Sequence, residues 1–383
     1  MSEITQMPNV QIEKRRFPIG TVILIALAGV GLVVGIIRFV LGMGATTNLS
    51  DFYPWGIWIG FDVISGVALG SGAFTLAAIV HIFHLEKYRP VLRPAILTGF
   101  IGYILVIMGL LVDLGRPYNI WHLIIYWNSH SPLFEVGWCV MIYTSVLGLE
   151  VLPLVFERFN KPKALRVIHS LTIPLIIAGI TLSTMHQSTL GTLFLAMPDK
   201  LHPLWYSPLL PVFFYISAIA LGLAMVILES TISAKVFKHG LEKDVLSGLG
   251  RAIPYVLGLY LLLKLGDLVI AGEFGLMFEG SLRSFVFLAE IAVVILCIVL
   301  FALPKFRRDP AMLFWSSVIT IMGTVFNRIN VSLIGPRAPA GALYLPNWME
   351  VAVTVGLVSG GLIIFMLAVR FLPVFEEAEG HAD

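Results

Sequence analysis

The chain has 383 residues, of which 58% are hydrophobic and 13% charged, and its mean hydropathy is +0.93. Soluble domains carry about 25% charged residues, so this composition excludes an ordinary soluble enzyme and predicts a polytopic membrane protein surrounded by lipid. The net charge of +2 indicates no nucleic-acid partner, because no basic block with interleaved aromatic residues occurs outside the connecting loops.

Ten stretches are apolar enough to cross a bilayer as helices, which takes about 20 residues each. They run over 17–43, 53–85, 94–114, 133–156, 165–187, 207–235, 248–271, 282–303, 311–334 and 347–372. The first stretch follows a basic segment, but it exceeds the usual core of a signal peptide, so we keep it as a span. The sequence therefore predicts an all-α integral membrane protein with ten transmembrane helices.

Lysine and arginine near span ends are retained on the cytoplasmic side of a membrane. With the N-terminus inside, eighteen of the twenty-five lysines and arginines lie in inner segments. The outer loops contain only Arg116, Lys200, Arg283 and Arg337. We therefore expect both termini in the cytoplasm, with an N-terminal tail over 1–16 and a C-terminal tail over 373–383.

An internal repeat is indicated by a shift of 154 or 155 residues. The shift aligns Pro54 with Pro208, Asp113 with Asp267, and Glu135 with Glu290. Four spans separate the members of each pair, so their orientation in the membrane is preserved. The pattern predicts two parallel four-helix bundles, over 53–187 and 207–334, between flanking helices over 17–43 and 347–372.

Ionisable residues in or at the mouth of the predicted spans gather toward the outer side. They are Arg38, Asp62, Asp113, Arg116, Glu135, His186, Lys264, Asp267, Glu290, Arg328 and Glu350. A charge in hydrocarbon costs about 2.5 kcal/mol or more, so it persists where it is paired, hydrated or used. The clustering predicts a polar site near the outer surface.

In the first bundle, Asp62 lies about three turns below the outer surface, and His186 with Gln187 closes the span 165–187 on the same side. Glu135 and Arg38 lie at neighbouring span ends. A neutral imidazole and a carboxylate at matched depth can hydrogen-bond the carbonyl oxygens of a quinone and carry its protons. The alternative is that Asp62 pairs with Arg38 and only locks two helices together.

In the second bundle, Lys264 and Asp267 lie one turn apart, a spacing that lets them face each other. Arg328 is placed to neutralise Glu290 or Asp267. A structural ion-pair network and a proton relay both fit these residues, and we assign no catalysis to them. Further candidates for a proton route share burial in a span or a place at its end: Asp113, Arg116, His81, Glu150, His169 and Glu229.

Cys139 and Cys297 are the only cysteines, which excludes four-cysteine iron–sulfur ligation and a disulfide framework. No metal site is expected. A di-haem b-type cytochrome stays an alternative, although His186 has no intramembrane histidine at its own depth. An ion or solute transporter is a further alternative, but the prolines of the spans do not occupy matched positions in the two halves.

Several motifs resemble one known family. They are Pro54-Trp55-Gly56 with Asp62, Asp113-Leu114-Gly115-Arg116, the stretch from Met185 to Gly191 with its His186-Gln187-Ser188, His202-Pro203-Leu204-Trp205, Asn327-Arg328, and Tyr344 to Glu350. They are similar to the membrane subunits of the NrfD/polysulfide reductase family, in its ten-span HybB/DsrP/Hmc-type branch. The resemblance covers nearly the whole chain.

The resemblance implies a cofactor-free, quinone-reactive subunit of the inner (cytoplasmic) membrane of a bacterial or archaeal cell. Menaquinone or ubiquinone would be its substrate, with no haem or iron–sulfur cluster in this chain. Its expected partners are a periplasmic ferredoxin-like iron–sulfur subunit and hydrogenase, molybdopterin-type or multihaem cytochrome c subunits. By this resemblance, Asp62 and His186 lie where the quinone pocket is expected.

Overall fold

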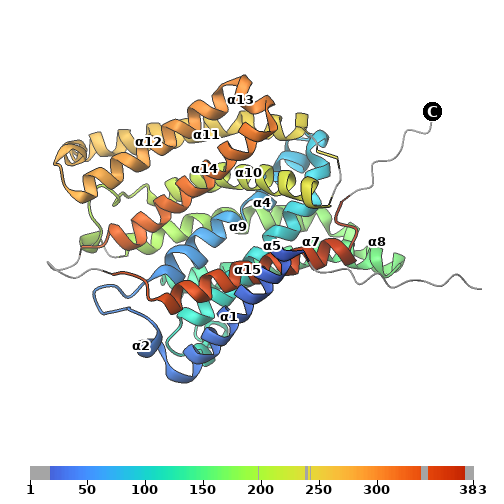
Figure 1. Ribbon diagram of the computed structural model, residues 1–383, viewed down its shortest axis with the longest axis horizontal. Coiled ribbons are helices and arrows are strands. Elements are labelled where there is room, and N and C mark those ends of the chain that lie inside the picture. The colour runs from blue at the N-terminus through green and yellow to red at the C-terminus, as the bar shows by residue number, and fades with distance from the viewer. Residues whose placement is uncertain (1–17, 197, 238–239, 242, 338–343, 376–383) are drawn as a thin grey trace, which may run out of the picture.

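The long helices of the protein run side by side from one end of the molecule to the other (Figure 1). The structure is a computed structural model that describes residues 18–196, 198–237, 240–241, 243–337 and 344–375. Within these residues, nine helices are long and apolar enough to cross a membrane, or ten if one bent pair is a single span. This confirms a helical, multi-pass integral membrane protein. The predicted tail 1–16 and residues 376–383 of the other tail lie outside the described residues.

The spans follow the predicted order along the chain. They are α1 (Ile19–Leu41), a composite helix of η1 (Trp58–Ser65), α3 (Gly66–Leu69), α4 (Gly72–Ala77) and η2 (Ala78–Ile82), then α5 (Leu92–Asp113), α7 (Pro132–Arg158), α9 (Thr172–Leu195), α10 (Leu210–Phe237), α11 (Lys243–Ile270), α12 (Leu282–Ala302), α14 (Pro310–Ile329) continued by η7 (Asn330–Ile334), and α15 (Trp348–Phe371). Short helices occupy the connections: α2 (Met43–Thr46), η3 (Glu86–Val91), η4 (Pro117–Asn119), α6 (His122–Ile125), α8 (Pro162–Ser170), η5 (Pro198–Lys200), η6 (Phe274–Phe278) and α13 (Pro304–Arg308).

The helices pack as two groups with a flanking pair. The composite helix, α5, α7 and α9 contact one another, and so do α10, α11, α12 and α14, while α10 also touches α4 and α9 and joins the groups. The flanking helix α1 packs along α15, which rests on α5 (Figure 1). The helices that contact one another are those of the two predicted bundles and the flanking pair. The residue boundaries of the two bundles stay a prediction.

Helix caps place acidic residues at helix starts. The Ser131 hydroxyl accepts a hydrogen bond from the Phe134 amide and starts α7 at Pro132, so Glu135 lies in its first turn. Asn347 and Glu350 form a capping box at the start of α15. Local sequence therefore fixes where these two carboxylates enter the bundle.

The fifth span differs from its prediction over 165–187. Two helices replace it, because the chain bends by 54° at Leu171 between α8 and α9, and α9 then continues to Leu195. The polar residues after Met185 do not end the helix, since they are accommodated inside the protein; the Ser188 hydroxyl, for example, bonds back to the Thr184 carbonyl. His186 thus lies about 13 Å before the helix end, at 1.5 Å per residue, and not at the end itself.

Candidate functional site

The side chain of His186 is fully buried between α9 and α5. Its Nδ1 lies 3.0 Å from the hydroxyl of Tyr103, whose ring meets the ring of Tyr143 edge-on at 4.7 Å. The Nε2 atom of His186 has no hydrogen-bond partner among the described residues, and the buried hydroxyls of Ser183 and Tyr143, which interact with each other, add two more polar groups to this cluster. Buried polar groups normally find a partner, so this concentration indicates a place for water or a polar ligand.

The residues next to His186 tie α9 to its neighbours. The Gln187 amide nitrogen donates to the Val67 carbonyl at 2.9 Å and so fastens α9 to the composite helix. The Thr189 hydroxyl donates to the Glu135 carboxylate at 2.6 Å, one turn closer to the helix end. The predicted neighbourhood of His186, Gln187 and Glu135 is therefore brought together on one stretch of α9.

Asp62 lies at another level of the same bundle. Its carboxylate accepts a hydrogen bond of 2.7 Å from Thr354 of α15, and it packs on Gly109, where an added Cβ would lie 2.8 Å from its own Cβ. Tyr103, which meets His186, precedes Gly109 by six residues on α5, or about 9 Å along the helix axis. The expected matched depth of Asp62 and His186 is therefore wrong by nearly two helical turns.

Arg38 does not pair with Asp62. Its guanidinium is buried and donates to the Leu114 carbonyl at 2.5 Å, which contradicts the alternative of a direct Arg38–Asp62 lock. Asp113, next to that carbonyl, interacts electrostatically with both residues, and one of its carboxylate oxygens has no hydrogen-bond partner in the part of the chain that the structure describes. Arg116 lies exposed beyond the helix end.

Glu350, although buried, has a structural role. Its carboxylate accepts hydrogen bonds from the Tyr344 hydroxyl at 2.6 Å and from the backbone amides of Asn48 and Asn347 at 3.0 and 2.8 Å. Burial and the bond to Glu350 raise the pKa of Tyr344. Each polar atom of this carboxylate has a partner, so the residue joins the start of α15 to two loops.

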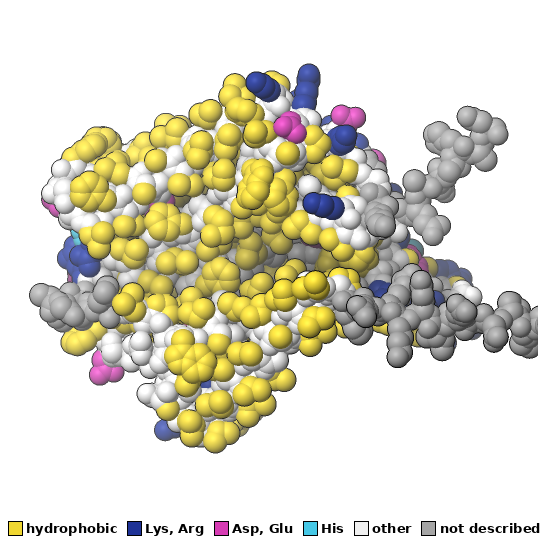
Figure 2. Space-filling model, viewed as in Figure 1, with side chains coloured by type: hydrophobic (Ala, Val, Ile, Leu, Met, Phe, Trp, Pro, Cys, Tyr) yellow, Lys and Arg dark blue, Asp and Glu magenta, His cyan; other side chains and the backbone are white. Residues whose placement is uncertain are grey.

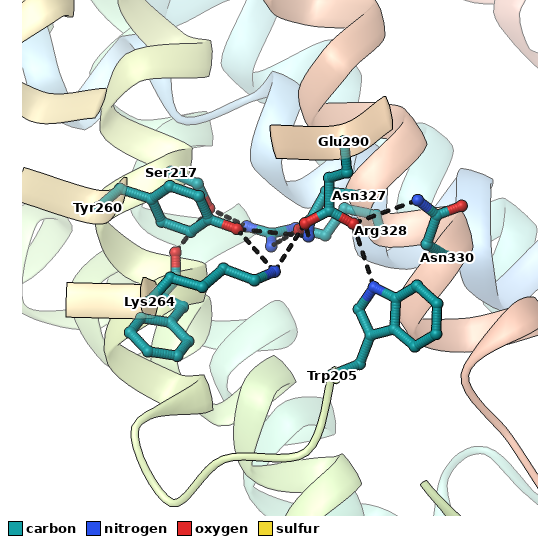
Figure 3. A network of polar contacts seen from close by, with 9 residues as sticks. Trp205, Ser217, Tyr260, Lys264, Glu290, Asn327, Arg328 and Asn330 are labelled. Carbon is teal, nitrogen blue, oxygen red and sulfur yellow. Dashed lines mark hydrogen bonds and ion pairs between the residues drawn. The ribbon is translucent and has the colours of Figure 1, made fainter. Parts of the chain in front are cut away.

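The second bundle contains a buried ion pair between Lys264 and Glu290, at 2.6 Å (Figure 3). Sequence spacing placed Lys264 against Asp267, which is wrong, because the lysine side chain points across to α12 and Asp267 is half-buried. The Glu290 carboxylate also accepts bonds from side-chain nitrogens of three residues: Trp205 at 3.1 Å, Asn327 at 2.7 Å and Asn330 at 3.2 Å. This saturation is typical of a structural network.

Arg328 is likewise not bound to Glu290 or Asp267 in the way that the sequence predicted. Its guanidinium donates to the Asn327 side chain at 3.0 Å, to the Phe214 carbonyl at 2.9 Å and to the Ser217 hydroxyl at 2.8 Å (Figure 3). It also stacks 3.7 Å from the centroid of the Phe214 ring. Arg328 therefore holds α14 to α10, and Asn327 links it indirectly to the Glu290 network.

The inner candidates are dispersed. Glu150 of α7 reaches Gly179 of α9, where an added Cβ would lie 3.5 Å from the carboxylate. The Glu229 carboxylate of α10 lies inside the protein beside the Thr98 hydroxyl of α5. His81 is half-buried at the end of the composite helix, and His169 is exposed on α8.

The surroundings of His186 do not fit a bis-histidine haem. Such a haem requires two imidazoles facing each other across the bundle, whereas Tyr103 is the partner of the His186 ring and His169 lies outside, on α8. Among the residues that the structure describes, no group of three or more histidine, cysteine, aspartate or glutamate side chains is arranged to hold a metal ion.

Sequence reasoning missed the hydroxyl groups of the site. Tyr103, Tyr143 and Thr354 each face a predicted site residue or its cluster from another helix. Ser183 precedes His186 by one turn, so the helical spacing of these two polar residues was a usable signal. No such signal existed for Thr354, because it lies 292 residues from Asp62 and only packing brings it there.

The chain is similar in sequence to known proteins over most of its length. Residues 45–336 match the family model described as polysulphide reductase, NrfD. A protein of Nitratidesulfovibrio vulgaris (strain Hildenborough) is 38% identical over 92% of this chain and 93% of its own length. The probable Ni/Fe-hydrogenase 2 b-type cytochrome subunit of Escherichia coli K12 is 32% identical, and the menaquinone reductase integral membrane subunit of N. vulgaris is 27% identical, each over 88% of this chain and 87% of the relative. The family model covers most of the chain, which thus belongs to the NrfD polysulphide reductase family.

Proposed function

We propose that this chain is the quinone-reactive membrane anchor of a multisubunit respiratory oxidoreductase in the inner membrane of a bacterium or archaeon. The observation that carries the proposal is the buried His186, whose Nδ1 is bonded to Tyr103 while Nε2 has no partner among the described residues. The names of two relatives, a menaquinone reductase subunit and a hydrogenase subunit, support it. Electrons would pass between menaquinone or ubiquinone and a partner that holds iron–sulfur clusters, because this chain has only two cysteines.

In the proposed site, a quinone ring lies between Asp62 and His186. Oxidation of a quinol releases two electrons and two protons, one from each hydroxyl group. The α5 residues that Asp62 and His186 contact, Gly109 and Tyr103, lie about 9 Å apart along the helix axis. We therefore assign one proton-accepting group to each hydroxyl.

Each acceptor has a second group to receive the charge. When Nε2 of His186 accepts a proton, its Nδ1–H can donate to the oxygen of Tyr103. Asp62 shares its surroundings with Asp113 and Arg38, so a proton taken up there stays within a group of two carboxylates and one guanidinium. Glu135, bonded to Thr189, would lead protons from the His186 level toward the outer end.

Release toward the other side would give proton translocation, which is the further part of the proposal. Tyr143 and Glu150 of α7 continue from the His186 cluster toward the inner end, where Glu229, His81 and His169 lie. Quinone turnover in sealed vesicles with the internal pH recorded tests this part. Turnover without any pH change inside the vesicle would restrict proton exchange to the outer side.

The central test compares His186→Gln with a matched variant, His130→Gln, at an exposed loop position. Quinone-dependent turnover of the purified complex should fall at least a hundredfold in His186→Gln, the scale of a lost general base. Turnover of the partner with an artificial dye should stay unchanged, as should all activities of His130→Gln. Undiminished quinone turnover in His186→Gln would refute the assignment.

A further inference from the structure

Two segments join to form a small platform at one end of the molecule. Residues 198–206 and 332–337 are held together by the bridge between Leu201 and Pro336 and by two backbone bonds: His202 N to the Gly335 carbonyl at 2.8 Å, and Arg337 N to the Lys200 carbonyl at 2.6 Å. The Arg283 guanidinium adds bonds to the carbonyls of Ile334 and Pro336, at 3.3 and 3.1 Å. We call this surface the outer platform.

The outer platform gathers positive charge. Lys200 and Arg337 are exposed, Arg283 is half-buried, and the acidic residues beside them are Asp199 of the first segment and the exposed Glu279, four residues before Arg283. Burial, together with Arg283 and Arg337, lowers the pKa of His202 to about 4, so that histidine is neutral at physiological pH. Figure 2 shows a small group of basic side chains at the end opposite the basic end that carries α8 and α13.

This charge lies on the side where basic residues are disfavoured. Three of the four lysines and arginines in the predicted outer loops belong to the platform. Membrane insertion selects against positive charge on this side, so its retention at one spot indicates a use. An acidic protein surface is the partner that such a basic patch fits.

Buried side-chain contacts hold the outer platform against the second bundle. Trp205 rises from the first segment and donates its indole N–H to Glu290, and the Lys264–Glu290 pair is itself buried in the second bundle (Figure 3). A cavity of about 40 Å³ lies at the edge of the platform, lined by Lys200, Leu201 and Pro336 and by Trp55 and Phe194 of the first bundle. The charged side chains of the platform therefore lie beside the end of the bundle that contains His186.

We propose that Lys200, Arg283 and Arg337 form the docking site for an acidic surface of the iron–sulfur partner. This proposal rests on the proposed function and adds to it the place where the partner binds. It also gives the second bundle a role, because its buried Glu290 network fixes the segment that carries Lys200. Arg283 and Arg337 then contact the partner near the mouth of the quinone-reactive bundle.

The test uses the double variant Lys200→Glu/Arg337→Glu in the full chain, purified through a tag on this chain from native membranes in mild detergent. Arg283 is left intact because it holds the platform together. The matched control is Lys305→Glu/Arg308→Glu on α13, at the opposite end. Iron per chain and the electron paramagnetic resonance signal of the reduced sample report the bound partner. We expect about a tenfold loss of partner iron in the platform variant and none in the control.

The neutral variant Lys200→Gln/Arg337→Gln covers the case in which charge reversal prevents folding. It should retain the partner at low salt and lose it at lower salt concentrations than the wild type does. Equal iron in the wild type and both platform variants would overturn the docking site and leave the proposed function standing. A wild-type chain that purifies without iron would overturn the proposed function and the docking site together.

Discussion

The Tyr103 hydroxyl and His186 Nδ1 lie 3.0 Å apart inside the first bundle. The direction of the hydrogen bond between them is linked to which nitrogen of the imidazole carries the proton. If the hydroxyl donates, Nε2 carries the proton and can donate to a quinone oxygen. If Nδ1–H donates to the tyrosine oxygen, Nε2 is free to accept a proton from a quinol. One hydrogen bond thus permits both directions of quinone chemistry.

Replacing Tyr103 with phenylalanine should therefore slow quinone turnover without removing the imidazole. The loss of a buried hydrogen bond of about 1.4 kcal/mol corresponds to a tenfold lower rate constant. We expect kcat to fall by about this factor, with a smaller change in KM, because the variant removes proton transfer and not the space for quinone. Steady-state kinetics with a short-chain quinol analogue measures both constants.

Tyr255→Phe provides the control for this prediction, since Tyr255 is 75% exposed on α11. Both variants remove one hydroxyl group and keep the ring. Equal kinetic constants in Tyr103→Phe, Tyr255→Phe and the wild type would mean that the Tyr103–His186 contact has no part in turnover.

The sequence predicts the spans, their grouping and the polar residues that enter the membrane, because hydropathy and charge are properties of single residues. Partner choice was less predictable. Lys264 was matched with Asp267 from helical spacing, but packing of α11 against α12 brings Glu290 closer. The end of α9 was also missed, because polar side chains mark a helix end only when they face water, whereas Gln187 is buried and its amide nitrogen donates to the Val67 carbonyl.

The Lys264–Glu290 pair offers a test of scaffold against proton route. Lys264→Met leaves the Glu290 carboxylate buried without its cation, which should cost about 3–5 kcal/mol of stability. In Lys264→Met/Glu290→Gln, a neutral amide keeps one acceptor oxygen for the surrounding nitrogens, so part of the stability should return. Thermal unfolding in detergent measures both variants.

A scaffold requires the single variant to unfold at a clearly lower temperature than the double variant. A proton route predicts another result. The unfolding temperature of Lys264→Met would then stay near that of the wild type, and only the pH change in sealed vesicles would be lost.

The crossing of α1 and α15 depends on two glycines. A Cβ added to Gly31 would lie 2.6 Å from the Gly356 Cα and 2.9 Å from the Ala352 carbonyl oxygen. Gly31→Ala should therefore push the helices apart and cost about 1–3 kcal/mol. Gly29→Ala is the matched control, because nothing lies within 4 Å of its added Cβ. Thermal unfolding of both variants checks the prediction, which fails if they shift the midpoint equally.

The low pKa of His202 predicts how acid affects the fold. In the unfolded chain this imidazole binds a proton near pH 6.5, but in the folded protein only near pH 4. Between these values the unfolded state holds more protons, so stability falls as the pH decreases from about 6.5 to about 4 and is fully present above that window. His202→Gln removes this titration and should show a smaller loss of unfolding temperature between pH 7 and pH 5.

The low pKa of His202 also predicts that this histidine contributes no charge to partner binding at the outer platform. Because its low pKa keeps His202 neutral above about pH 5, this residue adds no positive charge to the platform between about pH 5 and pH 8. Partner retention should therefore depend strongly on salt and hardly on pH in this range, and His202→Gln should retain the partner as the wild type does. A loss of partner iron on raising the pH from 5.5 to 7.5 at fixed salt would instead require a protonated His202 at the contact.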